Sequence, residues 1–179
     1  MGNTNPDRRS FQSAFRQRNG GIDRRRPKTP EGLWQRGTGM GYLIDTNVWS
    51  ELQKRERTHP SVQRWYAGVA KEELYLSVLV VGEVRRGIER LRRRDSQQAE
   101  RLEQRLEQLQ AAMMGRILPV SLAIAERWGR INVPDPLPVI DGLLAATALE
   151  HDLILVTRNV ADVERSGVRL FNPFVDVIS

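Results

Sequence analysis

Polar side chains that could bind a cation follow two of the short apolar segments in this sequence. Asp45 comes directly after the apolar run 42–44, and Asn159 and Asp162 follow the run 153–156. Carboxylate and amide oxygens at the ends of buried strands are placed to bind a ligand. Asp162 is equally explained as a solvated loop acid or a helix cap.

Two further carboxylates, Glu83 and Asp141, lie among apolar neighbours in segments with helical spacing. A carboxylate buried in such surroundings is costly unless it has a partner. If several carboxylates converge, they repel one another and need a cation. Because the chain has no cysteine and two histidines, oxygen ligands dominate, and these favour Mg²⁺ or Mn²⁺ over zinc.

Each of these acids also has a simpler structural explanation. Asp45 could be only a helix N-cap. Glu83 could pair with Arg86 or Arg90, which lie on the same side of a helix. Asp141 could be an acid at a helix start, where the helix dipole favours it. These alternatives stay open for each residue alone, and the order of the residues along the chain carries the hypothesis of a shared site.

Apolar runs alternate with helical segments from residue 42 onward. The pattern predicts strands at 42–44, 74–76, 117–120, 153–156 and 170–171. It predicts helices at 48–54, 61–70, 78–91, 95–115, 122–131 and 139–150. Strands that alternate with helices predict an α/β fold with a short, mostly parallel central sheet flanked by helices on both faces.

The first 39 residues differ sharply in composition from the rest. They hold nine Arg or Lys against three acids, which accounts for the whole net charge of +6. The segment has no helical or strand periodicity, so we expect it to be disordered. It could be a basic arm for nucleic acid, a tail without a role, or a mis-assigned start before Met40. The sequence therefore predicts one domain over residues 40–179.

Several function classes are excluded by composition. Without cysteine the chain can form no disulfide, thiolate zinc site or cysteine nucleophile. No run approaches the roughly 20 apolar residues that cross a bilayer, and no secretory signal is present. We therefore expect a cytoplasmic protein without a membrane partner.

Four motifs in order resemble those of the PIN-domain ribonucleases, in particular the VapC-like and FitB-like toxins of type II toxin–antitoxin systems. They are LIDTNV at 43–48, LSV at 76–78 with GEVRRG at 82–87, IDGLLAATA at 140–148, and VTRN at 156–159 followed by LFNPF at 170–174. The resemblance covers nearly all of residues 40–179.

This resemblance implies roles for individual residues. Asp45, Glu83 and Asp141 match the three main acidic residues of the family and would hold Mg²⁺ or Mn²⁺. Thr157 matches the hydroxyl residue that orders the site, and Asn159 stands where many relatives have a fourth Asp. Thr46 and Asp162 are expected to support the site from a second layer.

The resemblance also implies a metal-dependent endoribonuclease with an RNA substrate, a small cognate antitoxin and a homodimeric state. RNA needs positive charge, because phosphates dominate nucleic-acid affinity. Residues 40–179 are neutral overall, so we expect Arg85, Arg86 and Arg90 to supply that charge locally. A solvated helix face paired with acids is the alternative. The antitoxin could contact Trp49, Leu52, Trp65 and Tyr66, although core packing is the commoner fate of such residues.

Two other functions compete with this hypothesis. A haloacid-dehalogenase-type phosphatase would need Asp-x-Asp after the first strand, but the third residue here is Asn47. A catalytically weakened PIN-like module that binds nucleic acid or antitoxin is the stronger alternative, because Asn159 removes one negative charge from the site.

Overall fold

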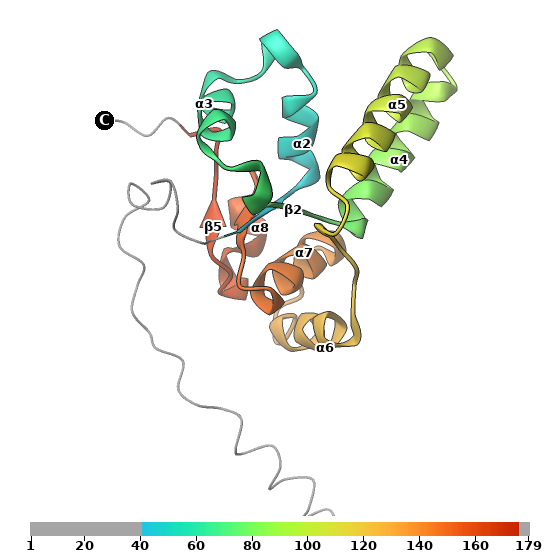
Figure 1. The fold of residues 1–179 in the computed structure, drawn as a ribbon. Coiled ribbons are helices and arrows are strands. Elements are labelled where there is room, and N and C mark those ends of the chain that lie inside the picture. The colour runs from blue at the N-terminus through green and yellow to red at the C-terminus, as the bar shows by residue number, and fades with distance from the viewer. Residues whose placement is uncertain (1–40, 176–179) are drawn as a thin grey trace, which may run out of the picture.

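The computed structural model describes residues 41–175, and these form an α/β fold around one five-stranded sheet (Figure 1). The strand order is β3-β2-β1-β4-β5, and every pair of neighbours is parallel. The strands are β1 (Tyr42–Ile44), β2 (Leu74–Ser77), β3 (Ile117–Leu118), β4 (Ile154–Val156) and β5 (Leu170–Phe171). The predicted fold class is confirmed.

The helices follow the predicted segments closely. They are α2 (Thr46–Leu52), α3 (Pro60–Gly68), α4 (Val78–Arg92), α5 (Ser96–Ala112), α6 (Leu122–Ile131), α7 (Val139–Glu150) and the short α8 (Val160–Val163). The first helix begins two residues earlier than predicted, because Asp45 caps it by accepting a hydrogen bond from the Thr46 amide. Helix α5 ends before Gly115, whose φ of 80° is incompatible with a right-handed helix.

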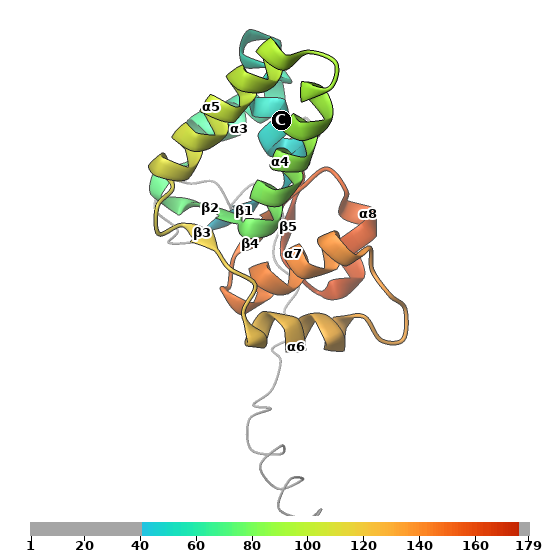
Figure 2. The ribbon, with the colours of Figure 1, turned by 90° about the vertical axis from the view of Figure 1, so that its right-hand side faces the viewer.

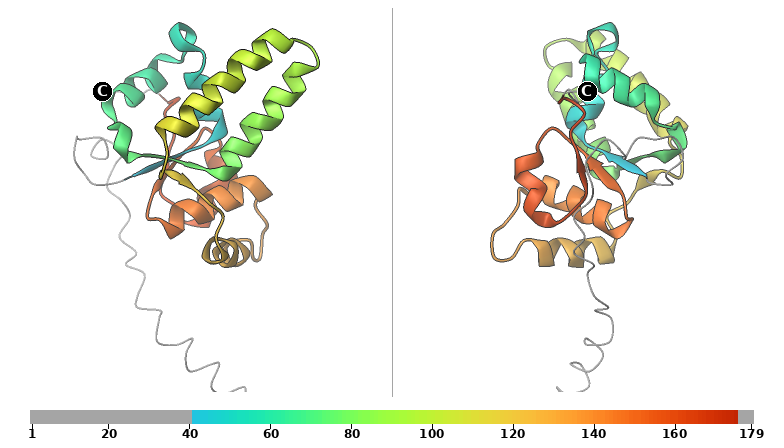
Figure 3. Two further views of the ribbon diagram at one scale, coloured as in Figure 1. Left: turned by 45° about the vertical axis from the view of Figure 1, so that its right-hand side comes forward. Right: turned by 90° about the vertical axis from the view of Figure 1, so that its left-hand side faces the viewer.

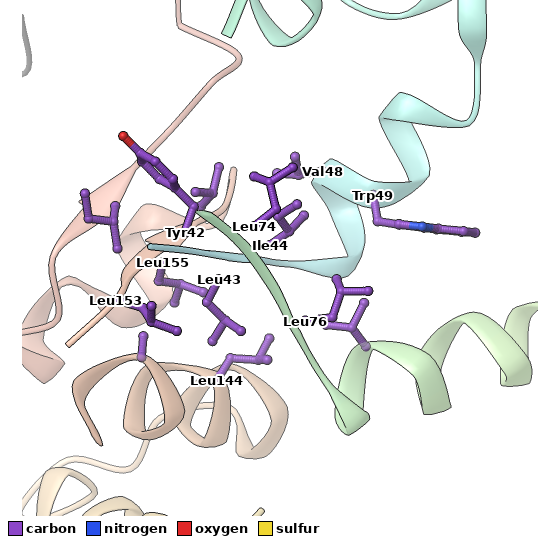
Figure 4. Packing of buried hydrophobic residues seen from close by; sticks show 14 of the residues in the cluster. Tyr42, Leu43, Ile44, Val48, Trp49, Leu74, Leu76, Leu144, Leu153 and Leu155 are labelled. Atoms are coloured by element: carbon purple, nitrogen blue, oxygen red, sulfur yellow. The ribbon is translucent and has the colours of Figure 1, made fainter. Parts of the chain in front are cut away.

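Apolar residues on both faces of the sheet are covered by helices (Figure 4). Leu43 points toward Leu144 of α7, while Ile44 lies on the opposite face near Val48 of α2. All four side chains are buried. The three-residue strand β1 is therefore fixed from two sides, which also fixes the residue that follows it, Asp45.

Helices α4 and α5 form an antiparallel hairpin that extends away from the sheet (Figures 2 and 3). Glu103 of α5 joins the two helices by accepting hydrogen bonds from Arg85 and Arg92 of α4. The Arg92 Nη2 to Glu103 Oε2 distance is 2.6 Å. Arg92 also pairs with Glu89 of its own helix at 3.3 Å. These ion pairs fix one side of α4 against α5.

Helix α6 packs closely on α7 below the sheet (Figure 2). The contact depends on Gly142, because an added Cβ would lie 3.1 Å from Trp128 Cδ1 and 3.3 Å from Leu137 Cβ. Gly142 directly follows Asp141, so the glycine that permits the close packing also positions a candidate site residue.

Within residues 41–175, no helix is both long enough and apolar enough to cross a membrane. The expectation of disorder for residues 1–39 concerns a segment that lies outside the described residues, and it stays a prediction.

Candidate functional site

Asp45 lies at the carboxyl end of β1 and is buried, with 5% of its surface exposed. Its backbone N–H donates to the Val156 carbonyl of the neighbouring strand β4 at 3.0 Å. Because β1 and β4 are parallel and in register, their ends coincide, and Thr157 stands beside Asp45. The parallel pairing thus brings together two residues that are 112 positions apart.

The Asp45 carboxylate accepts three hydrogen bonds. Thr157 Oγ1 donates to Oδ2 at 2.7 Å, and Asn47 Nδ2 donates to the same oxygen at 2.5 Å. The Thr46 amide donates to Oδ1 at 2.5 Å. A carboxylate has about four lone-pair positions, so these bonds fill both on Oδ2 and leave one on Oδ1. Asp45 is held rigidly with one oxygen available to a ligand.

Glu83 on α4 is connected to the same region through Thr46. Thr46 Oγ1 donates to Glu83 Oε2 at 2.6 Å. The other carboxylate oxygen, Oε1, lies 3.4 Å from Arg86 Nη2. The alternative in which Glu83 pairs along its helix is therefore present in the structure, together with the link to the end of β1.

Asp141 occupies the first turn of α7 and is partly buried. Burial raises the pKa of its carboxyl, and the charges of Asp45, Asp162 and Glu83 raise the pKa further. Burial is also the main cause that raises the pKa of Asp45, with a smaller contribution from Glu83, against the hydrogen bonds that lower it. Asp141 therefore lies near enough to three other carboxylates to be affected by their charges. We refer to Asp45, Glu83, Asp141 and Asp162 as the acidic site.

The donor set of the acidic site fits a hard divalent cation, since it consists of oxygens whose charges are not cancelled within the cluster. As the side chains stand, no group of three acidic or histidine residues in the part of the chain that the structure describes is arranged to hold a metal ion. Binding a cation therefore requires side-chain adjustment, for which Asp141 and the exposed Asp162 have room.

Sequence reasoning did not give the position of Asn47, and it assigned to the side chain of Asn159 a place that only its backbone takes. Asn47 contacts Asp45, Thr157 at 3.1 Å and the Arg158 amide at 3.2 Å, so it joins the ends of both strands. The position of Asn47 directly after Asp45 and Thr46 was the feature of the sequence that could have indicated its role. The Asn159 amide donates to Thr157 Oγ1 at 3.0 Å, while its side chain is exposed.

The arginines after Glu83 divide into two groups. Arg85, expected to contact nucleic acid, is paired with Glu103 and lies 3.8 Å from Glu89. Arg86 lies beside Glu83, and Arg90 is exposed. Of the aromatic residues expected to contact a partner, Trp65 is 2% exposed and belongs to the core, Trp49 is 6% exposed, and Tyr66 is 39% exposed.

Comparison with known proteins assigns this arrangement to a family. The PIN domain family matches residues 42–161. The chain is 34% identical to the toxin FitB of Neisseria gonorrhoeae over 140 residues, which cover 75% of this chain and 99% of the relative. It is 31% identical to a VapC ribonuclease of Sinorhizobium fredii over 141 residues, covering 74% and 96% of the two chains.

Solved structures agree with the sequence comparison. The crystal structure of FitAcB from Neisseria gonorrhoeae matches with a TM-score of 0.69 and 32% identity, covering 74% of this chain and 98% of that chain. A toxin–antitoxin complex from Klebsiella pneumoniae matches with a TM-score of 0.57 and 25% identity, with 74% and 98% covered.

Replacing Thr157 with Val should destabilise the fold by about 1–3 kcal/mol, because a buried carboxylate loses a donor and two N–H groups lose an acceptor. The matched control is Thr147→Val, whose equally buried hydroxyl donates to the Leu143 carbonyl within α7. That carbonyl keeps its helical partner, so this change should cost less than about 1 kcal/mol. Urea unfolding of both variants measures the difference, and equal losses would contradict the assigned role of Thr157.

Asp141→Asn should make the folded state more stable than the parent at neutral pH. Because the folded-state pKa of Asp141 is raised, the folded state binds the proton more tightly than the unfolded chain. The parent therefore loses stability as pH rises through that pKa, and the variant does not. Free energies of unfolding between pH 4 and 8 test this, with the exposed Glu107→Gln on α5 as control. A stability difference that does not grow with pH would contradict it.

Proposed function

Since the chain belongs to the PIN domain family, we propose that it is a metal-dependent endoribonuclease and the toxin of a toxin–antitoxin pair. The observation that carries the proposal is the buried Asp45 at the carboxyl end of β1, which lies near enough to Glu83 and Asp141 for their charges to interact. Asp45 and Asp141 have pKa values raised by burial and by neighbouring acidic charge. A bound divalent cation would neutralise the charges of the acidic site and so lower the cost of placing these carboxylates close together. The domain that carries this activity is assigned to residues 40–179.

Each acidic residue receives a role from its contacts. Asp45, fixed by three hydrogen bonds, and Asp141, partly buried on α7, would hold Mg²⁺ or Mn²⁺. Glu83, oriented by the Thr46 hydroxyl, would complete the ligand set or position the attacking water. Asp162 would add negative charge where Asn159 has none, and Thr157 keeps Asp45 in place.

Hydrolysis of an RNA phosphodiester needs an activated water and relief of the charge that develops on the phosphoryl oxygens. A bound divalent cation supplies both, since it acidifies water and neutralises charge. The protein residues contribute orientation. Asp45 is anchored at the end of a buried strand, so its free lone pair has a fixed direction. Glu83 accepts the Thr46 hydroxyl through Oε2, which leaves Oε1 to accept a proton from water once Arg86 moves aside.

The expected activity is cleavage of single-stranded RNA with Mg²⁺ or Mn²⁺ and none with a chelator. Asp45→Asn and Asp141→Asn should each lower the cleavage rate by at least about a hundredfold, because both remove a charged ligand. Labelled RNA on denaturing gels gives the rates, and titration calorimetry gives Mn²⁺ affinity, which Asp141→Asn should weaken. Glu107→Gln, which changes an exposed acid on α5, is the control with unchanged rate.

Three outcomes bear on the alternatives. Cleavage that persists in chelator would exclude the metal-dependent mechanism. RNA that stays intact with either metal, while Mn²⁺ still binds, would favour the weakened binding module that the neutral Asn159 motivates. Cleavage of phosphate monoesters instead of RNA would favour a phosphatase.

We propose that the antitoxin docks on an apolar hollow of about 470 Å³ between α2, α3 and α5. Trp49, Leu52, Tyr66, Leu109 and Met113 are among the residues that line it. Trp49 Nε1 is buried and has no hydrogen-bond partner within the described residues 41–175. Figure 4 shows the Trp49 ring extending away from the residues of the sheet. The hollow therefore fits a peptide segment that presents an apolar side chain.

The partner to test is a small protein encoded immediately upstream of the gene. Tyr66→Glu should abolish co-purification with that protein, because it places a charge at the apolar hollow. Ala67→Glu, one residue further on α3 and exposed, is the matched control and should leave the complex intact. Equal binding by both variants would move the contact elsewhere. Light scattering of the chain alone in the same series should give two copies, as expected for the proposed cytoplasmic homodimer.

A further inference from the structure

The arginines of α4 and its C-cap, Arg93, lie on two different sides of the helix. Because successive residues turn by about 100°, Arg86, Arg90 and Arg93 fall within about 80° of arc that also contains Glu83. We refer to these three arginines as the basic stripe. Arg85 and Arg92 lie outside this arc and both pair with Glu103 of α5, although Arg92 also lines the hollow that the basic stripe borders.

The basic stripe borders a surface hollow of about 410 Å³ that Arg86, Glu89, Arg90, Arg92 and Arg93 line. The single acid of this hollow, Glu89, is paired with Arg92 at 3.3 Å and lies 3.8 Å from Arg85. Its charge is therefore balanced from within α4. Arg90 and Arg93 are exposed and make no ion pair among residues 41–175, so the hollow carries uncompensated positive charge.

The hollow is also connected to the acidic site. Arg86 lies at one end of the basic stripe and contacts Glu83. With about 1.5 Å of rise per residue, Arg90 lies about 10 Å and Arg93 about 15 Å along α4 from the level of Glu83. Figure 3 shows that α4 runs outward from the sheet with α5 alongside it. Positive charge thus leads away from the acidic site along one line.

We propose that the basic stripe is the track that holds the RNA backbone on one side of the cleaved bond; this rests on the proposed ribonuclease function. Stacked nucleotides of one strand advance by about 3.4 Å per phosphate. Arg90 and Arg93 therefore meet phosphates about three and four nucleotides from the reacting one. Arg86 meets the nearest phosphate, and this contact draws it from Glu83. Arg85 and Arg92 belong to the α4–α5 contact and do not bind RNA.

The stripe has a purely structural explanation as well. Arg90 lies in the last turn of α4, and basic residues there stabilise a helix through its dipole. That explanation predicts an effect on stability which does not depend on RNA length. An RNA track predicts an effect that depends on length and on salt, so the two are separable by experiment.

The test compares Arg90→Gln/Arg93→Gln with the control Arg57→Gln/Arg101→Gln, which removes two exposed arginines elsewhere and gives the same net charge. The substrates are single-stranded RNAs of about 4 and about 12 nucleotides, and the shorter one, cut at its first bond, ends before Arg90 and Arg93. On the longer RNA the stripe variant should show kcat/KM reduced about tenfold, chiefly through KM. The slope of log KM against log salt should fall by about 1.4, as expected for two lost phosphate contacts. On the shorter RNA it should equal the parent.

Three outcomes would overturn the assignment of the basic stripe. If the parent cuts RNA and both double variants lose the same activity, the stripe assignment is overturned while the ribonuclease function stands. If the stripe variant cuts normally but no longer binds the antitoxin, the stripe is a protein-binding surface, which also overturns the assignment. If the parent neither cuts nor binds RNA, the proposed function fails, and the stripe assignment falls with it.

Discussion

The structure depends on one buried carboxylate held at the junction of two parallel strands. Asp45 is 5% exposed and has acidic neighbours, an arrangement that costs free energy unless hydrogen bonds stabilise it. The Thr157 hydroxyl, the Asn47 amide and the Thr46 N–H provide those bonds. Parallel pairing of β1 with β4 is what delivers Thr157 to that point. Sheet topology and site electrostatics are therefore parts of one constraint, since a different strand order would leave Asp45 buried without its donor.

Short-range patterns predicted the elements better than the contacts. The apolar segment 139–150 was predicted as a helix, and α7 has those bounds, because its composition is strongly apolar throughout. The long helix expected to end near 115 stops at Ala112, where the left-handed Gly115 follows. The contacts of Asn47 were not predicted, because its partner Thr157 is 110 positions away. Local sequence patterns do not reveal contacts between residues so far apart in the chain. This contact follows from the pairing of β1 with β4.

The ion pairs of the α4 arginines were also not predictable from the sequence. A run of basic residues after Glu83 is visible in the sequence, but the sequence does not say which of them meet acids. That depends on where α5 packs, and Glu103 of α5 engages Arg85 and Arg92. The other two arginines within α4, Arg86 and Arg90, are exposed to solvent, and Arg86 also lies 3.4 Å from Glu83. One helix thus stabilises the hairpin with one side and presents positive charge with the other, so each side tolerates different substitutions.

The distance in sequence between Asp45 and Thr157 has a consequence for the timing of synthesis. The strand that follows α7 is the fourth of five along the chain, and its last residue immediately precedes Thr157. A polypeptide still on the ribosome has completed β1, β2 and most helices before that hydroxyl emerges. Until then β1 lacks its partner β4, and Asp45 lacks the hydroxyl of Thr157. A chain that ends before Thr157 therefore lacks the hydroxyl that donates to Asp45 at 2.7 Å.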